Sequence, residues 1–137
     1  MAAVKELLRA EENGTLSFGD FELEAKTKKA DFEYQGDLYK VKTFREITKL
    51  ERNGMLVYES DPGTAVHEFA QSGGKTSFEL ETPEDAQIIL GLAEDADYRV
   101  TIDGADCGIV HTGMGGKLVL SVEASDGRSV RVLVEKQ

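Results

Sequence analysis

The chain has 137 residues and a formal net charge of -10 at pH 7, with 40% hydrophobic and 31% charged residues. Such a chain can bury a sizeable core, and its negative charge disfavours nucleic acid and anionic membrane surfaces as partners. The single cysteine excludes an intramolecular disulfide. Residues 1–14 contain three glutamates and no apolar signal-peptide segment, so we expect a cytoplasmic protein.

The N-terminal residues 2–12 are predicted to form a short helix. Val4, Leu7 and Leu8 would share one face of this helix, and Asn13-Gly14 supplies a stop at its C-terminal end.

Strand patterns follow the predicted helix. Residues 15–25 have the pattern of a strand with a kink at Gly19. Residues 26–37 indicate a charged loop with a short strand, and residues 38–44 alternate as a strand does.

Residues 45–60 fit two different structures. A helix is supported by the capping box that Thr43 and Glu46 would form, with Gly54 at its end. A hairpin is supported by an Asn53-Gly54 turn followed by the alternating residues 55–60. The surrounding chain is strongly β, which favours the hairpin.

The rest of the chain predicts short strands at a spacing of about ten residues, which is typical of a sandwich or barrel. These strands cover residues 64–70, 75–81, 86–92, 98–103, 107–111, 117–123 and 128–135. We therefore predict a mostly β protein. A short N-terminal helix and a β-rich part would occupy residues 1–62, and a β-sandwich-like part residues 63–137, as two parts or as one compact domain.

Two segments of the chain repeat one pattern. GGKTSFELE at 73–81 matches GGKLVLSVE at 115–123, and the match continues without a gap from 82–92 onto 124–134. We interpret the two segments as β-hairpins of the same kind, each beginning at a Gly-Gly corner. Alternation would place one set of side chains in the core, namely Phe78, Leu80, Leu118, Leu120 and Val122. Their neighbours Ser77, Glu79, Val119 and Ser121 would face outward.

The Gly-Gly-Lys-Thr run at 73–76 resembles part of a phosphate-binding loop, but the full pattern is missing. Phe69 stands where the first glycine of such a loop is required. The residues after Thr76 alternate as a strand, whereas a phosphate-binding loop leads into a helix. We therefore predict that no nucleotide binds near Lys75, and we expect no cofactor.

Carboxylates gather between residues 94 and 106, at Glu94, Asp95, Asp97, Asp103 and Asp106. A strand of five residues would separate Asp95 and Asp97 from Asp103 and Asp106 by about 15 Å. One calcium ion cannot bridge that distance, so polar turns explain these residues better, and we predict no metal site.

The chain has only three Cys or His residues, which are Cys107, His111 and His67. Zinc sites in proteins use three or four such ligands. Cys107 and His111 would lie about 13 Å apart on one strand, too far for a nucleophile and its base. We predict an inert, buried Cys107 and no catalytic residue.

The run GDLYKVKTFREITKLERNG, followed by VYESDPGTAV, resembles a set of short uncharacterised bacterial proteins, some of which are labelled endosialidase. The segments DADYRVTIDGADCG and GGKLVLSVE look like the β-sandwich accessory modules of bacterial carbohydrate-active enzymes. The resemblance supplies no catalytic motif, so it assigns no functional residue. Proteins usually bind sugars through exposed aromatic side chains, and the chain has no Trp. Aromatic residues at strand positions more often pack in a core or on a sheet face, and we expect this of Tyr34, Tyr39, Tyr58 and Tyr98.

A basic segment interrupts the acidic chain. Its members are Lys26, Lys28, Lys29, Lys40, Lys42, Arg45, Lys49 and Arg52. They form either an ordinary solvated face or a contact for the acidic C-terminal half of another copy, which would give a head-to-tail assembly.

These observations favour a non-catalytic binding or structural module that self-associates. The alternative is a carbohydrate-related accessory domain or a degenerate glycan-acting enzyme. We expect a homo-oligomer or a protein partner, with a glycan as a further candidate, and neither nucleic acid nor membrane. The residues that would bind a ligand are unknown from sequence.

Overall fold

The computed structural model describes residues 3–124 and 129–137, and this part of the chain contains thirteen β-strands and no helix. The strands are β1 (Leu8–Ala10), β2 (Leu16–Phe18), β3 (Thr27–Tyr34), β4 (Asp37–Phe44), β5 (Ile47–Arg52), β6 (Met55–Asp61), β7 (Ala65–Ser72), β8 (Lys75–Glu81), β9 (Ala86–Gly91), β10 (Asp97–Ile102), β11 (Ala105–His111), β12 (Lys117–Val122) and β13 (Val130–Lys136). The prediction of a mostly β protein is confirmed.

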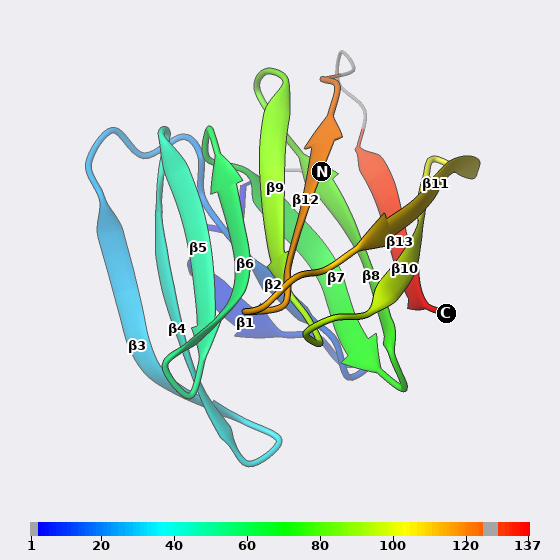
Figure 1. Cartoon of the computed structure of the whole chain (residues 1–137). Helices are drawn as coiled ribbons and strands as arrows, with labels where there is room; N and C mark the ends of the chain where they lie inside the picture. Colours follow the sequence, from blue (N-terminus) through cyan, green and yellow to red (C-terminus); the bar gives the residue numbers. More distant parts are fainter. Residues whose placement is uncertain (1–2, 125–128) are drawn as a thin grey trace.

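The strands form two antiparallel sheets that enclose one core (Figure 1). One sheet has seven strands in the order β1-β2-β7-β8-β13-β10-β11, and the other has six in the order β12-β9-β6-β5-β4-β3. Fully buried Phe18, Tyr58 and Phe78 pack edge-on near the centre, with Phe18 and Tyr58 centroids 5.3 Å apart and those of Tyr58 and Phe78 5.7 Å apart. Edge-to-face packing is the geometry that aromatic rings prefer.

Both sheets take strands from both sides of residue 62. The seven-stranded sheet includes β1 and β2, and the six-stranded sheet includes β9 and β12. The division predicted between residues 1–62 and 63–137 therefore does not coincide with the division between the sheets.

The predicted N-terminal helix over residues 2–12 is wrong. Leu7 has a left-handed φ of 71°, which turns the chain between Val4 and the β1 strand. The Val4 amide donates to the Gly19 carbonyl at 2.9 Å. This amide is therefore bonded to the residue that follows β2, and not to a residue one helical turn away. Val4 and Leu8 are both fully buried. A turn followed by the β1 strand therefore buries the apolar residues whose spacing suggested a helical face.

The hairpin prediction for residues 45–60 is confirmed. β5 and β6 pair in an antiparallel register around a turn at Asn53-Gly54, where both residues have positive φ. β5 alternates, with Thr48 and Leu50 buried and Ile47 and Lys49 half-buried on the opposite face.

The two repeated segments do not form hairpins, which corrects the interpretation of the repeat. β8 and β9 belong to opposite sheets, and so do β12 and β13. Instead, β8 pairs with β13, and β9 pairs with β12. The first strand of each repeated unit therefore pairs with the second strand of the other unit, in a pseudo-two-fold arrangement.

The inward and outward faces predicted from the repeat are confirmed. Phe78, Leu80, Leu118, Leu120 and Val122 are all buried. Val119 is 46% exposed, and Ser121 is exposed as well. Leu80 pairs with Val130 between β8 and β13, and the residues aligned with them in the repeat are Val122 and Ile88. Between β9 and β12, however, Val122 pairs with Ala86. This shift of two residues keeps every side chain on its face.

Candidate functional site

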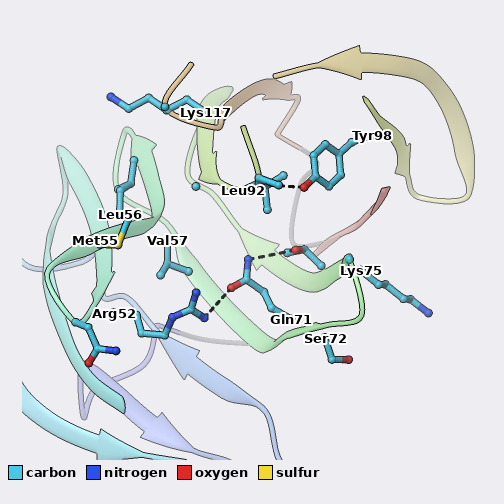
Figure 2. A pocket seen from close by; sticks show the side chains of 16 residues that line it. Arg52, Met55, Leu56, Val57, Gln71, Ser72, Lys75, Leu92, Tyr98 and Lys117 are labelled. Carbon is cyan, nitrogen blue, oxygen red and sulfur yellow. Dashed lines mark hydrogen bonds between the residues drawn. The ribbon is translucent and has the colours of Figure 1, made fainter. Parts of the chain in front are cut away.

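A groove of about 500 Å³ opens at one end of the sandwich, between the two sheets (Figure 2). It lies where the β5–β6 and β7–β8 turns approach the β9–β10 and β11–β12 connections. Its lining comprises Arg52, Asn53, Met55, Leu56, Val57, Gln71, Ser72, Gly74, Lys75, Thr76, Gly91, Leu92, Ala93, Tyr98, Gly115 and Lys117.

Both Gly-Gly-Lys corners of the sequence repeat contribute to this one groove. Gly74 lies in the β7–β8 turn and Lys75 begins β8, whereas Gly115 lies in the β11–β12 connection and Lys117 begins β12. The two corners share one hydrogen bond. In each corner the carbonyl of the second glycine accepts from an amide at the end of the strand that pairs with the following strand. The Gly74 carbonyl accepts from Lys136 N at 2.9 Å, and the Gly116 carbonyl accepts from Leu92 N at 2.7 Å. The pseudo-two-fold arrangement thereby places two lysines at one opening.

The groove is positively charged although the protein is acidic. Arg52, Lys75 and Lys117 line it, and no Asp or Glu does so among the described residues. None of the three cations forms an ion pair within residues 3–124 and 129–137. In Figure 2 the lysine side chains extend outward from opposite rims, whereas the Arg52 guanidinium points into the groove.

A short chain of hydrogen bonds holds the Arg52 guanidinium in place. Arg52 Nη1 donates to Gln71 Oε1 at 3.3 Å, and Gln71 Nε2 donates to the buried Thr76 hydroxyl at 3.2 Å. Gln71 follows the register shift that separates His67 from Ala70 in the β7–β8 pair. The shift sets which face of β7 carries the Gln71 side chain.

An apolar wall faces this polar row. Val57, Leu92 and Tyr98 form it, and both Val57 and Tyr98 are almost fully buried (Figure 2). The Tyr98 hydroxyl accepts a bond from Ala93 N at 3.1 Å. Its own proton has no acceptor among the described residues, so the O–H can donate to a bound molecule.

The structure explains the Gly-Gly-Lys-Thr run without a phosphate-binding loop. Lys75 begins β8, a strand whose Thr76 and Phe78 are buried, and no helix follows it. The prediction that nucleotides do not bind there stays a prediction.

The predicted acidic turns bind protein groups. Asp95 and Asp97 both contact the His111 ring, at 2.8 Å from Nε2 and 2.7 Å from Nδ1 respectively. The Arg99 guanidinium donates to the Asp106 carboxylate at 2.6 Å, and the Arg131 amide donates to the Asp103 carboxylate at 2.9 Å. Within the described residues, no group of three or more His, Cys, Asp or Glu side chains has the arrangement of a metal site. The hydrogen bonds from Asp97 and then Asp95 raise the pKa of His111.

Cys107 is exposed, so the prediction that it is buried is wrong. It lies on β11, an edge strand in which Gly108 has a φ of 93° and the register shifts opposite Arg99 and Thr101. Most side chains of this edge strand are exposed, and Cys107 faces solvent as Ile109 and His111 do. His111 forms its contacts with Asp95 and Asp97 and none with Cys107.

His67 is buried at 8% exposure, and its Nε2 atom has no hydrogen-bond partner. It lines a second hollow together with Arg9, Glu11 and Glu68. Arg9 and Ser17 both donate to the Glu11 carboxylate, and the Ser17 hydrogen bond is the largest cause that lowers the pKa of Glu11.

The tyrosines are mainly structural. Tyr39 and Tyr58 are buried, and the half-buried Tyr34 packs against Tyr39 with ring centroids 6.2 Å apart. Burial raises the pKa of Tyr58, whose hydroxyl bonds Thr64 at 2.7 Å. Tyr98 alone among the four lines the groove shown in Figure 2.

The basic segment forms a face on the outer side of the six-stranded sheet, which we call the lysine face. It comprises Lys26, Lys28, Lys40, Lys42 and Lys49 on and beside β3, β4 and β5. Lys42 lies directly opposite Lys28 on one side and Lys49 on the other. Lys28 above all, followed by burial and by the other lysines, lowers the pKa of Lys42.

Sequence reasoning missed the groove and grouped Arg52 with the basic segment. No local motif joins Arg52, Gln71 and Tyr98, because they come from three strands in two sheets. One signal was present in the sequence, since the repeat marked both Gly-Gly-Lys corners. It could not show that the corners lie at the same opening, because that depends on how the two units pair.

Comparison of the chain with family models, with curated proteins and with solved structures finds no match. The resemblance to short bacterial proteins labelled endosialidase therefore stays an expectation. The part of the chain that the structure describes has no helix able to span a membrane.

Proposed function

We propose that this protein is a non-catalytic β-sandwich binding module whose end groove binds a small organic anion. The observation that carries the proposal is the lining of the groove. In a chain of net charge -10, the described lining contains three cations and no carboxylate. Cations that form no ion pair with the protein attract anions at an opening and can hydrogen-bond to them.

The residue types in the groove support binding more than catalysis. Glycoside hydrolysis needs two carboxylates, and the described lining has none. The lining described here also lacks the Cys or His that would activate a nucleophile.

Isothermal titration calorimetry with a panel of small anions tests the proposal. We expect at least one organic anion to bind, and we expect binding to be lost in the variant Arg52→Gln/Lys75→Gln/Lys117→Gln. Lys49→Gln on the lysine face is the matched control, because it removes a positive charge from a residue that does not line the groove. If no anion binds at millimolar concentration, or if the triple variant binds as well as the wild type, the proposal fails.

A carbohydrate-related role is the second candidate, and one observation favours it. The Tyr98 hydroxyl lines the groove with a proton that no described residue accepts, so an acidic sugar could hydrogen-bond to it and to the cations. A glycan array would separate this reading from the first. Signals confined to acidic glycans and lost with Arg52→Gln would support the carbohydrate role.

Self-association is the remaining part of the proposal, and the lysine face supports it. Residues 26–52 carry eight basic and five acidic side chains, a net charge of +3 within a chain of -10. Oppositely charged surfaces on one molecule favour a head-to-tail contact between copies. Light scattering should show an oligomer that dissociates with added salt and with Lys42→Glu, but not with Lys117→Glu. A monomer at every salt concentration would exclude self-association.

A further inference from the structure

The half-buried Arg52 guanidinium is the most specific recognition group in the groove. A guanidinium has five N–H donors in a planar fork. Arg52 uses one of them on Gln71, and the described residues accept no other. An arginine held in a groove of an acidic protein without a carboxylate partner has the donors that a carboxylate ligand needs.

The bond between Gln71 and Thr76 adds to this specificity. Because Gln71 Nε2 donates to Thr76, its Oε1 atom is the one turned towards Arg52. The guanidinium is therefore held from one side, and its remaining edge is free. A fixed fork loses less conformational entropy on binding than a free side chain does.

The groove lining opposite Arg52 indicates which chemical group the bound carboxylate carries. Half-buried Leu92 presents apolar surface to the groove, whereas Val57 and Tyr98 line it with little exposed surface. The volume of about 500 Å³ suits a small organic molecule. An inorganic anion would leave that apolar surface uncovered. The lysines extend outward at the rims, so the full charge of a phosphate would meet only one cation inside the groove (Figure 2).

We propose that the groove binds an organic carboxylate, with the carboxylate on the Arg52 fork and an apolar body against the half-buried Leu92. This inference rests on the proposed function, because it names the class of anion that the groove takes. Lys75 and Lys117 then act at the rims by attracting the ligand, and Gln71 acts as a positioning residue for Arg52.

Four probes separate the contributions of charge and apolar surface. They are octanoate, acetate, octan-1-ol and inorganic phosphate, each titrated into the full chain by calorimetry. We expect octanoate to bind at least about tenfold more tightly than acetate, because acetate lacks the apolar body. Octan-1-ol should bind at least about tenfold more weakly than octanoate, because it lacks the charge-assisted bonds.

Variants test the assignment to Arg52. Arg52→Lys keeps the charge but loses the fork, so octanoate should bind at least about tenfold more weakly. Gln71→Ala should weaken octanoate binding less than Arg52→Lys does. The matched control is Arg131→Lys, which lies at an exposed pair with Glu79 and should leave binding unchanged. The melting temperature of each variant checks that it folds, and the Arg52 side-chain Nε–Hε signal should shift on addition of octanoate.

The outcomes distinguish the two proposals. If phosphate binds and octanoate does not exceed it, the groove is an anion site but the carboxylate inference is wrong. If octanoate binds equally to the wild type and to Arg52→Lys, the assignment to the fork is wrong. If none of the three anions binds, the carboxylate inference and the proposed function fail together.

Discussion

Alanine at the second glycine of each repeat corner tests whether the two corners differ as the structure requires. Gly116 and Gly74 have similar left-handed φ values, 69° and 79°. Alanine pays roughly 1–2 kcal/mol for that conformation at either site. A Cβ at Gly116 would also collide with the Leu92 carbonyl oxygen, which is backbone and cannot turn away. At Gly74 the nearest atom would be the Lys136 Cβ at 3.1 Å, on an exposed strand end.

The expected free energies of unfolding therefore separate. Gly116→Ala should lower the free energy of unfolding by about 2–4 kcal/mol, because it adds the conformational cost and removes the bond from Leu92 N to the Gly116 carbonyl. Gly74→Ala should lose about 1–2 kcal/mol. Urea unfolding followed by circular dichroism measures both losses. Equal losses, or a larger loss for Gly74→Ala, would show that the Gly116 corner does not pack against the β9 end as described.

Three further predictions follow from packing and charge. Leu120→Ala should lower the free energy of unfolding by about 2–5 kcal/mol, and Ser121→Ala should stay within roughly 0.5 kcal/mol of the wild type, as urea unfolding would show; the reverse order would overturn the register. Lys42→Glu should raise the melting temperature at low salt and lose that advantage at high salt, because it replaces a lysine set between two others; a lowered melting temperature would contradict this. His111 should titrate by NMR above its ordinary value of about 6.5. Because its pKa is raised in the folded state, the stability it contributes is present at low pH and lost as pH rises through the folded pKa; a midpoint at or below the ordinary value would show that its two carboxylate contacts do not form.

The sequence predicted the strands well where alternation and turn residues agree. The Asn53-Gly54 turn is one example, since both residues adopt the positive φ that such a hairpin turn requires. The faces of β8 and β12 are another, because period two leaves each side chain only one of two faces.

The prediction failed where tertiary contacts decide the local structure. Val4 and Leu8 have helical spacing, but a left-handed Leu7 places both in the core without a helix. Cysteine is a residue type that is usually buried, yet Cys107 lies on an edge strand whose side chains are mostly exposed. Local sequence also cannot say whether two consecutive strands pair with each other or cross to opposite sheets. That choice decides where the Gly-Gly-Lys corners meet, so the groove could not be derived before the fold was known.

The exchange of partners between the two repeated units has a consequence for how the chain folds. Leu80 pairs with Val130, which lies 50 residues later in the sequence, and Leu16 pairs with Phe69 in the same sheet. Neither unit can complete its own strand pairing locally, so the seven-stranded sheet forms only after long loops have closed. Proteins with such high contact order refold in milliseconds to seconds, far more slowly than helical bundles of similar size. We therefore expect slow refolding after dilution from urea in a stopped-flow experiment, with β8 and β13 gaining protection against hydrogen exchange together.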